Sequence, residues 1–276
     1  MTTKFLARVL VLLCSLLAIL PAAAEILFTA PPRETPEDAA KIYGPVADYL
    51  TEAIGEKVTY RHLSSWGLYQ ATMPKNQYDL VFDGPHFVAW RVSQLQHEPL
   101  ARLSGLLTFV VITKQDNPDY TDINTLKGHA VCGLAPPNLA TLTLLDQFGP
   151  AQQPLLIQTQ SFREAYQGVI DGKCRAAVLR DKLYHKLEGN TGRTRVIFES
   201  SGFPNQAFTA SANLSDAQKV RIVSALLAPE AATRISGFLN KYSHGKGLVR
   251  ATRAEYRGME KPLQDMWGFE LGRSGG

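Results

Sequence analysis

The sequence predicts an α/β fold built from two similar halves. Short apolar, strand-like runs alternate with capped helical segments, and this alternation stops at a β-branched run over residues 106–113 and then begins again. The segment at residues 79–90, DLVFDGPHFVAW, passes from a strand straight into a helix. Strands separated by helices pair in parallel with right-handed crossovers. We therefore expect two mainly parallel sheets, each flanked by helices.

The first half has a β-α-β-α-β-α pattern. We expect strands at residues 25–30, 58–61 and 78–82, and helices from Thr35 to Gly55, after Ser64 or Ser65, and from Pro85. Thr35 is a good N-cap, because Pro36 suits the first helical position and acidic residues follow it.

The junction at residues 79–90 predicts a ligand site. Pro85 suits a first helical turn, since its fixed φ is already helical and its missing N–H would have no partner there. The neighbouring N–H groups and the positive end of the helix dipole then point into a crevice at the carboxyl end of the strand. An anion or a polar small molecule fits such a place.

The second half restarts the pattern after residues 106–113, which have no helix after them and suit a crossover between lobes. Strands are expected at 130–134, 155–158 and 176–179, with helices at 139–147 and from Ser161 to Gly172. Ser161 and Glu164 have the spacing of a capping box. Residues 196–200 and 206–211 are strand-like, and the remainder is expected to be helical, with capping boxes at Ser215 and Thr252.

The first 24 residues are typical of a cleavable secretory signal. Lys4 and Arg8 precede an apolar stretch, and Ala22-Ala23-Ala24 forms an A-x-A site before Glu25. We expect an exported protein in the periplasm. Cleavage leaves 252 residues and takes two of the 29 basic and none of the 25 acidic residues, so the net charge is +2. Without a basic run that could follow a phosphate backbone, nucleic acid is a poor partner.

No catalytic or cofactor motif competes with a binding function. The sequence has no G-x-S-x-G, H-E-x-x-H, G-x-x-x-x-G-K-[ST] or G-x-G-x-x-G motif, and its six histidines lack the spacing of metal ligands. We expect no cofactor and no metal. Cys132 and Cys174 remain after cleavage, and either a disulfide or two buried free thiols is consistent with their strand-like surroundings.

Several segments in order resemble a known family. They are YGPVADYL at 43–50, YDLVFDGP at 78–85, LKG at 126–128, Ser161 with a helix ending in Asp171-Gly172, and Phe203-Pro204. The chain resembles, over nearly all of the mature length, the phosphate/phosphite/phosphonate-type substrate-binding proteins of ABC transporters, which have the type II periplasmic binding fold.

The resemblance implies two lobes joined by a two-strand hinge, with the ligand closed between them. Lobe one would be residues 25–107 plus 205–276, and lobe two residues 108–204. The implied function is capture of a small anionic ligand for an inner-membrane permease by a monomeric, non-enzymatic protein. An alternative is a ligand-sensing partner of a membrane histidine kinase with the same fold, and a periplasmic enzyme is less favoured.

The expected ligand residues come from both halves of the chain. In the family, small hydroxyl residues at the second helix start hold the phosphonate, whereas this chain offers Asn138 and Thr141, with Phe162 beside Ser161. Arg180 ends a strand and suits an anion, with pairing to Asp181 or to a surface acid as the alternative. His86 can donate to an oxyanion, and Trp66 suits either an aromatic wall or the core. The complete expected set is Arg33, Trp66, Asp83, Gly84, His86, Phe87, Asn138, Leu139, Ala140, Thr141, Phe162 and Arg180.

Overall fold

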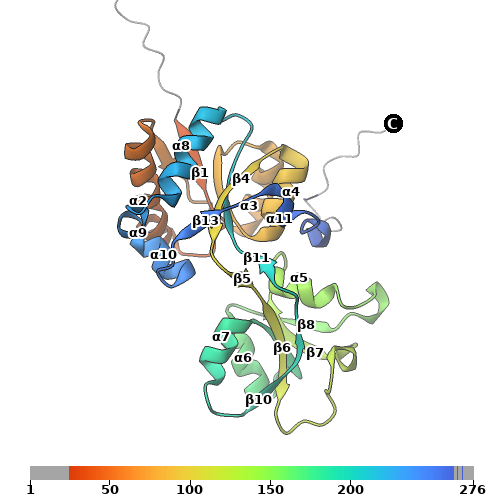
Figure 1. Cartoon of the computed structure of the whole chain (residues 1–276). Helices are drawn as coiled ribbons and strands as arrows, with labels where there is room; N and C mark the ends of the chain where they lie inside the picture. The colour runs from red at the N-terminus through yellow and green to blue at the C-terminus, as the bar shows by residue number, and fades with distance from the viewer. Residues whose placement is uncertain (1–24, 264–265, 267–268, 270–276) are drawn as a thin grey trace, which may run out of the picture.

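The computed structural model describes residues 25–263, 266 and 269, so the expected signal segment lies outside the described residues. The described chain forms two lobes, each with a central sheet flanked by helices (Figure 1). The α/β fold class with two lobes is as predicted. No helix in this part of the chain is long and apolar enough to cross a membrane.

The first lobe contains a six-stranded sheet of order β13-β4-β12-β3-β1-β2. Strand β1 pairs in parallel with β2 and β3, whereas β12 is antiparallel to β3 and β4, and β13 is antiparallel to β4. The strands are β1 (Ile26–Thr29), β2 (Val58–Tyr60), β3 (Leu80–Asp83), β4 (Glu98–Leu103), β12 (Ala207–Ala210) and β13 (Leu248–Arg250).

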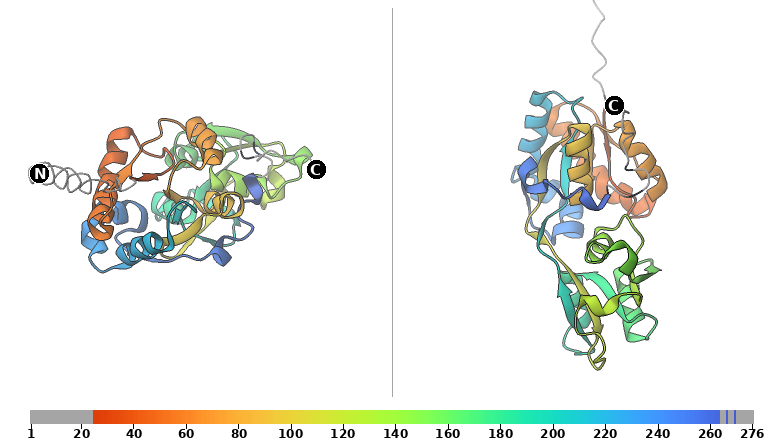
Figure 2. Two further views of the ribbon diagram at one scale, coloured as in Figure 1. Left: turned by 90° about the horizontal axis from the view of Figure 1, so that it is seen from above. Right: turned by 90° about the vertical axis from the view of Figure 1, so that its right-hand side faces the viewer.

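Helices cover both faces of this sheet (Figure 2). One face packs on α2 (Pro36–Ile54), α8 (Asp216–Leu227), α9 (Ala231–Arg234) and α10 (Ser236–Ser243). The other packs on α3 (Trp66–Thr72), η1 (Met73–Lys75), α4 (Pro85–Leu95), α11 (Arg253–Tyr256) and η4 (Lys261–Leu263). Thr35 and Gly55 cap α2 as expected, with the Thr35 side chain accepting from the Asp38 N–H and Gly55 in the left-handed conformation.

The second lobe contains a five-stranded sheet of order β10-β6-β9-β7-β8. Its strands are β6 (Phe109–Lys114), β7 (Ala130–Leu134), β8 (Leu155–Thr159), β9 (Ala176–Arg180) and β10 (Thr194–Glu199). Helix α5 (Leu139–Leu145) packs on one face, and α6 (Phe162–Ile170) and α7 (Asp181–Glu188) pack on the other. Short 3₁₀ turns η2 (Ile123–Leu126) and η3 (Pro150–Gln152) complete the lobe.

Two chain segments connect the lobes and pair with each other. Strand β5 (Leu106–Leu107) is antiparallel to β11 (Phe203–Pro204) and forms a separate two-stranded ribbon. The two sheets are formed by residues 26–103 with 207–250, and by residues 109–199. The exact lobe boundaries expected at 107/108 and 204/205 stay predictions.

Three details differ from the sequence prediction. Both sheets are mixed rather than mainly parallel. Strands β4 and β13 were not predicted, β12 is antiparallel to β3 and β4, and β6 is antiparallel to β9. Helix α7 was also not predicted. At α6 the Ser161 hydroxyl accepts from the Glu164 N–H as expected, but the Glu164 carboxylate accepts from the N–H of Gln160, one residue before the cap.

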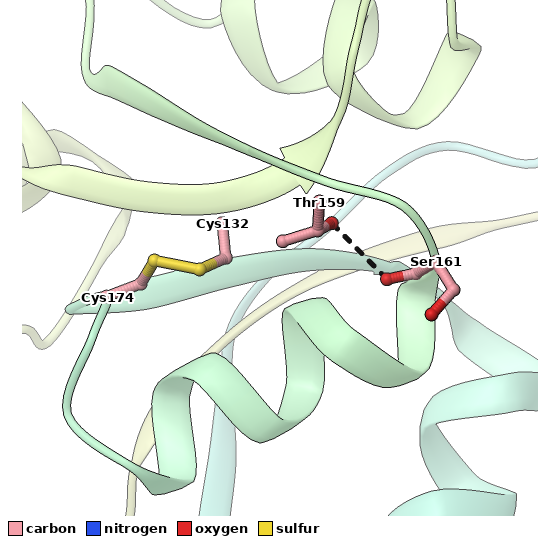
Figure 3. The surroundings of a disulfide bond; sticks show 4 residues. All are labelled: Cys132, Thr159, Ser161 and Cys174. Atoms are coloured by element: carbon pink, nitrogen blue, oxygen red, sulfur yellow. Dashed lines mark hydrogen bonds between the residues drawn. A yellow bond between two sulfur atoms is a disulfide. The ribbon is translucent and has the colours of Figure 1, made fainter.

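A disulfide joins Cys132 on β7 to Cys174, just before the neighbouring strand β9 (Figure 3). The two Cα atoms are 5.7 Å apart, and both side chains are buried. Of the two alternatives that the sequence left open, the structure has the bridge. It ties together the strands whose carboxyl ends carry ligand-site residues of the second lobe.

Candidate ligand-binding site

A cavity of about 420 Å³ lies between the two lobes. The first lobe contributes the loop after β1, the start of α3 and the start of α4; the second contributes the starts of α5 and α6 and the end of β9. The cavity is lined by Pro32, Arg33, Trp66, Gly84, Pro85, His86, Phe87, Leu107, Phe109, Leu134, Pro137, Asn138, Leu139, Ala140, Gln160, Phe162, Arg180, Gln206 and Tyr242. Ten of the twelve expected residues are therefore brought together here.

Two arginines bring positive charge to the cavity from opposite lobes. Arg33 follows β1 in the first lobe, and Arg180 ends β9 in the second. Neither guanidinium forms an ion pair with any residue that the structure describes, and Arg33 Nη1 is a buried atom without a hydrogen-bond partner. Burial, together with the positive charge of Arg33, lowers the pKa of Arg180 to about 10. Both side chains are charged at neutral pH and repel each other, and an anion between them would relieve this repulsion.

His86 links the two lobes. Its Nε2 lies 2.9 Å from the carbonyl oxygen of Pro137, so Nε2–H donates across the cleft and Nδ1 carries the lone pair. Burial, with the charge of Arg33 as a smaller cause, lowers the pKa of His86 to about 3, and the ring is neutral. Nδ1 is buried and has no partner. His86 therefore supplies a hydrogen-bond acceptor to the cavity, not the expected donor for an oxyanion.

Gly84 allows this arrangement. It is the N-cap of α4, and a Cβ built on it would lie 3.1 Å from His86 Cε1 and 3.7 Å from Arg33 Nη2. No side chain caps this end of α4, so its first N–H groups are left for a ligand or solvent. The absence of a side chain at Gly84 thus lets the imidazole of His86 approach the helix start.

Aromatic and aliphatic side chains form the rest of the wall. The Trp66 and Phe87 rings are 6.3 Å apart, and Trp66 is 37% exposed although Phe87 is buried. Phe162 lies at the start of α6 and packs partly against both cores of the second lobe. Of the two alternatives for Trp66, the wall position is observed. The cavity thus offers aromatic and aliphatic surface beside two cations.

Two expected residues do not line the cavity. The Asp83 carboxylate accepts from Arg91 Nε at 2.7 Å and from the Tyr69 hydroxyl, and all three side chains are buried. Thr141 Oγ1 donates to the Leu134 carbonyl at 2.6 Å. The ligand role expected for these two is not supported, because their polar atoms are already used within the protein. Trp90 on α4 is buried, and its Nε1 donates to the Phe269 carbonyl.

The sequence prediction missed three polar lining residues. Gln160 precedes the α6 cap, Gln206 lies between the hinge strand β11 and β12, and Tyr242 comes from α10, far along the chain. Gln206 could have been found, since it follows the expected hinge motif Phe203-Pro204. Tyr242 has no local sequence signal, because its place in the lining depends on tertiary packing: its hydroxyl contacts the Tyr43 hydroxyl and donates to Glu34.

Asn138 is both a cap and a lining residue. Its Oδ1 accepts from the Ala140 N–H at 3.0 Å, which leaves the side-chain NH₂ to face a ligand. Arg180 does not pair with Asp181, whose carboxylate instead lies 3.1 Å from His185 Nε2. Among the described residues, no group of three or more His, Cys, Asp or Glu side chains could hold a metal ion. The site is suited to binding by hydrogen bonds and by charge.

Comparison with known proteins gives the family. A family model described as "ABC transporter, phosphonate, periplasmic substrate-binding protein" matches residues 28–256. The chain belongs to this family. It is thus a periplasmic substrate-binding protein of an ABC transporter, as the resemblance in the sequence implied. The comparison with curated protein sequences finds no match.

Solved structures of this binding-protein fold are similar over most of the chain. A Xanthomonas citri protein solved with ATP bound has a TM-score of 0.71 at 12% identity, covering 87% of this chain and 97% of that one. PhnD1 of Prochlorococcus marinus, in complex with methylphosphonate, has a TM-score of 0.67 at 13% identity, covering 87% and 97%. A binding-protein component of a Pseudomonas aeruginosa ABC phosphonate transporter has 0.60 at 14%, covering 88% and 85%. At these identities the likeness shows the fold.

Proposed function

We propose that this substrate-binding protein captures a small organic oxyanion in the cavity between its lobes and presents it to an inner-membrane permease. The observation that carries the proposal is that Arg33 and Arg180, which have no ion-pair partner among the described residues, line one cavity from opposite lobes. An anion that contacts both arginines requires the lobes to be close. Its binding therefore shifts the molecule toward the closed arrangement.

The apolar wall favours an anion with an organic part over inorganic phosphate. Trp66, Phe87 and Phe162 offer ring surface beside the cations, and an apolar group placed there gains about 25 cal/mol per Å² of buried surface. The methylphosphonate and ATP held by two similar structures are both phosphorus oxyanions, which supports this class of ligand.

Titration calorimetry of the exported protein tests the proposal. The panel is phosphate, phosphite, methylphosphonate, a phenyl-substituted phosphonate, and the matching sulfonates and carboxylates. We expect organic oxyanions to bind more tightly than phosphate. Arg33→Ala and Arg180→Ala should each weaken binding about 10- to 100-fold, the usual cost of a hydrogen bond to a charged group.

Arg221→Ala is the matched control, because Arg221 is a surface arginine paired with Glu56 outside the cavity and its loss changes the net charge equally. If Arg33→Ala and Arg180→Ala both leave the affinity for the anion unchanged, the assignment of this cavity as the ligand site is wrong. If no anion in the panel binds, the alternative in which the protein senses a ligand for a membrane histidine kinase gains weight. A neighbouring kinase gene, in place of permease and ATPase genes, would favour that alternative.

We further propose export by a signal segment cleaved after Ala24, and a monomeric protein. N-terminal sequencing of the protein recovered from the periplasm would give Glu25 as the first residue. Light scattering would give the mass of one mature chain. A retained N-terminus or a dimer would overturn the respective proposal.

A further inference from the structure

A second cavity, of about 380 Å³, lies beside the hinge. It is formed by both lobes: the connection at residues 104–108 and Asn205, the start of α7, and the end of α10. In Figure 1 the end of α10 faces α7 across the junction of the lobes. Leu107, Phe162, Arg180 and Tyr242 line this cavity and the first one, so the two adjoin.

The lining of this second cavity is strongly cationic. Lys182 and Lys186 come from α7, and Lys241, His244 and Lys246 come from the end of α10 and the residues after it. Within the described part of the chain, none of these four lysines forms an ion pair. The carboxylate in the lining, Asp181, lies against His185. The four lysine side chains are exposed to solvent, and the described lining of the cavity holds one carboxylate beside them.

These charges face one another from opposite lobes. Closing the lobes brings two lysines of α7 toward two lysines at the end of α10 and after it, and the repulsion between like charges opposes closure. The positive end of the α7 helix dipole lies at the same place, next to Asp181 in the first turn. An occupant with several negative charges would neutralise both sets of lysines at once and favour the closed arrangement.

We infer that this lysine-lined cavity is a second anion site, which takes a small, multiply charged oxyanion such as a di- or triphosphate group. A concave site of this volume admits a small molecule, and lysines bind phosphate as point charges without a fixed geometry. A single-charge anion would leave most of the lysines unpaired. This site adjoins the one proposed for the organic oxyanion and shares Arg180 with it, but Arg33 and Trp66 line only the first cavity, so Arg33→Ala distinguishes the two.

The test is calorimetric titration of the exported protein with sodium triphosphate. Lys182→Ala/Lys186→Ala and Lys241→Ala/Lys246→Ala should each raise the Kd for triphosphate about tenfold or more, because each removes two charge-assisted contacts. Arg33→Ala should leave triphosphate binding within about twofold. Thermal unfolding curves establish that each variant is folded.

The control variant is Lys127→Ala/Lys173→Ala, which makes the same change in net charge. Lys127 precedes β7 and Lys173 precedes β9, so both lie at the edge of the second sheet where these parallel strands begin, opposite to the edge where β9 ends at Arg180. If all three double variants bind triphosphate equally weakly, the loss of affinity comes from the change in net charge, and the inference is overturned. No binding of triphosphate, or binding abolished by Arg33→Ala alone, would also overturn it. Titration with the oxyanion panel reports separately on the first cavity.

Discussion

The ion pair between Asp83 and Arg91 shows how one buried contact supports the site. Arg91 Nε donates to Asp83 Oδ2 at 2.7 Å, Arg91 Nη2 lies 3.2 Å from the Tyr69 hydroxyl, and both charged side chains are almost fully buried. Asp83 is the last residue of β3, and Gly84 and His86 follow it directly. The pair therefore anchors the strand end from which α4 enters the ligand cavity.

Removing one partner of this pair should cost much more than removing both. Arg91→Met leaves the Asp83 carboxylate buried without a cation, and we expect a loss of about 3–5 kcal/mol in the free energy of unfolding. The double variant Asp83→Asn/Arg91→Met should recover a large part of it. Urea unfolding measures both. Arg102→Ala, which breaks the more exposed pair with Glu255, is the control and should cost about 1 kcal/mol or less. Equal losses in the single and double variants would contradict the prediction.

The position of a single residue could be predicted from the sequence where a local motif fixes it. Gly84, Pro85 and His86 follow from the turn after a buried strand and line the cavity, although His86 offers an acceptor in place of the expected donor. Asp83 was assigned wrongly, because the sequence does not reveal that Arg91 reaches back along α4 to pair with it. Tyr242 could not be found, since its place depends on how α10 packs against α2.

Helices were predicted where capping residues mark their ends, and strand β4 was missed because it contains a proline. The caps of α2 and α8 have their expected partners. Strand β4 contains Pro99, which lacks an N–H and argues against a strand. Strand β13 pairs only with residues 101–103, and the pairing of β12 with β4 is irregular next to Pro99. The sheet therefore tolerates the N–H that Pro99 lacks. It includes the antiparallel strands β4 and β13, which the sequence pattern did not indicate.

The disulfide between β7 and the start of β9 should stabilise the second lobe. The cysteines are 42 residues apart, and closing a loop of this length stabilises the folded state by about 4 kcal/mol in the chain-entropy account. Reduction by dithiothreitol, or Cys132→Ala/Cys174→Ala, should lower the free energy of unfolding by about 3–4 kcal/mol.

Denaturant unfolding followed by far-UV circular dichroism, with and without dithiothreitol, measures the effect. The Cys132→Ala/Cys174→Ala protein is the control, because the reductant should not change its stability further. A wild-type protein that unfolds at the same denaturant concentration in both conditions would show that the bridge contributes nothing.

On the scale of the whole molecule, His86 couples the lobes to pH. Its Nε2–H donates to Pro137 of the other lobe, and burial in this arrangement lowers the pKa to about 3. Arg33 is the charged neighbour that acts in the same direction. When the lobes separate, water reaches the ring and the pKa returns toward its ordinary value of about 6.5. Between these two values, only the open form binds the proton.

Acid should therefore weaken ligand binding. A group whose pKa is lower in the closed form stabilises that form above its ordinary pKa, and this advantage is lost as pH falls from about 6.5 toward 3. For a ligand that binds the closed form, the Kd should rise up to about 30-fold between pH 7.5 and pH 5. Calorimetry at both values with the tightest oxyanion of the panel measures this. His86→Asn keeps an amide donor for Pro137 but does not titrate, so the ligand's own ionisation affects both proteins equally and cancels in the comparison. A His86→Asn protein whose affinity falls with pH as steeply as the wild type would show that His86 is not the coupling group.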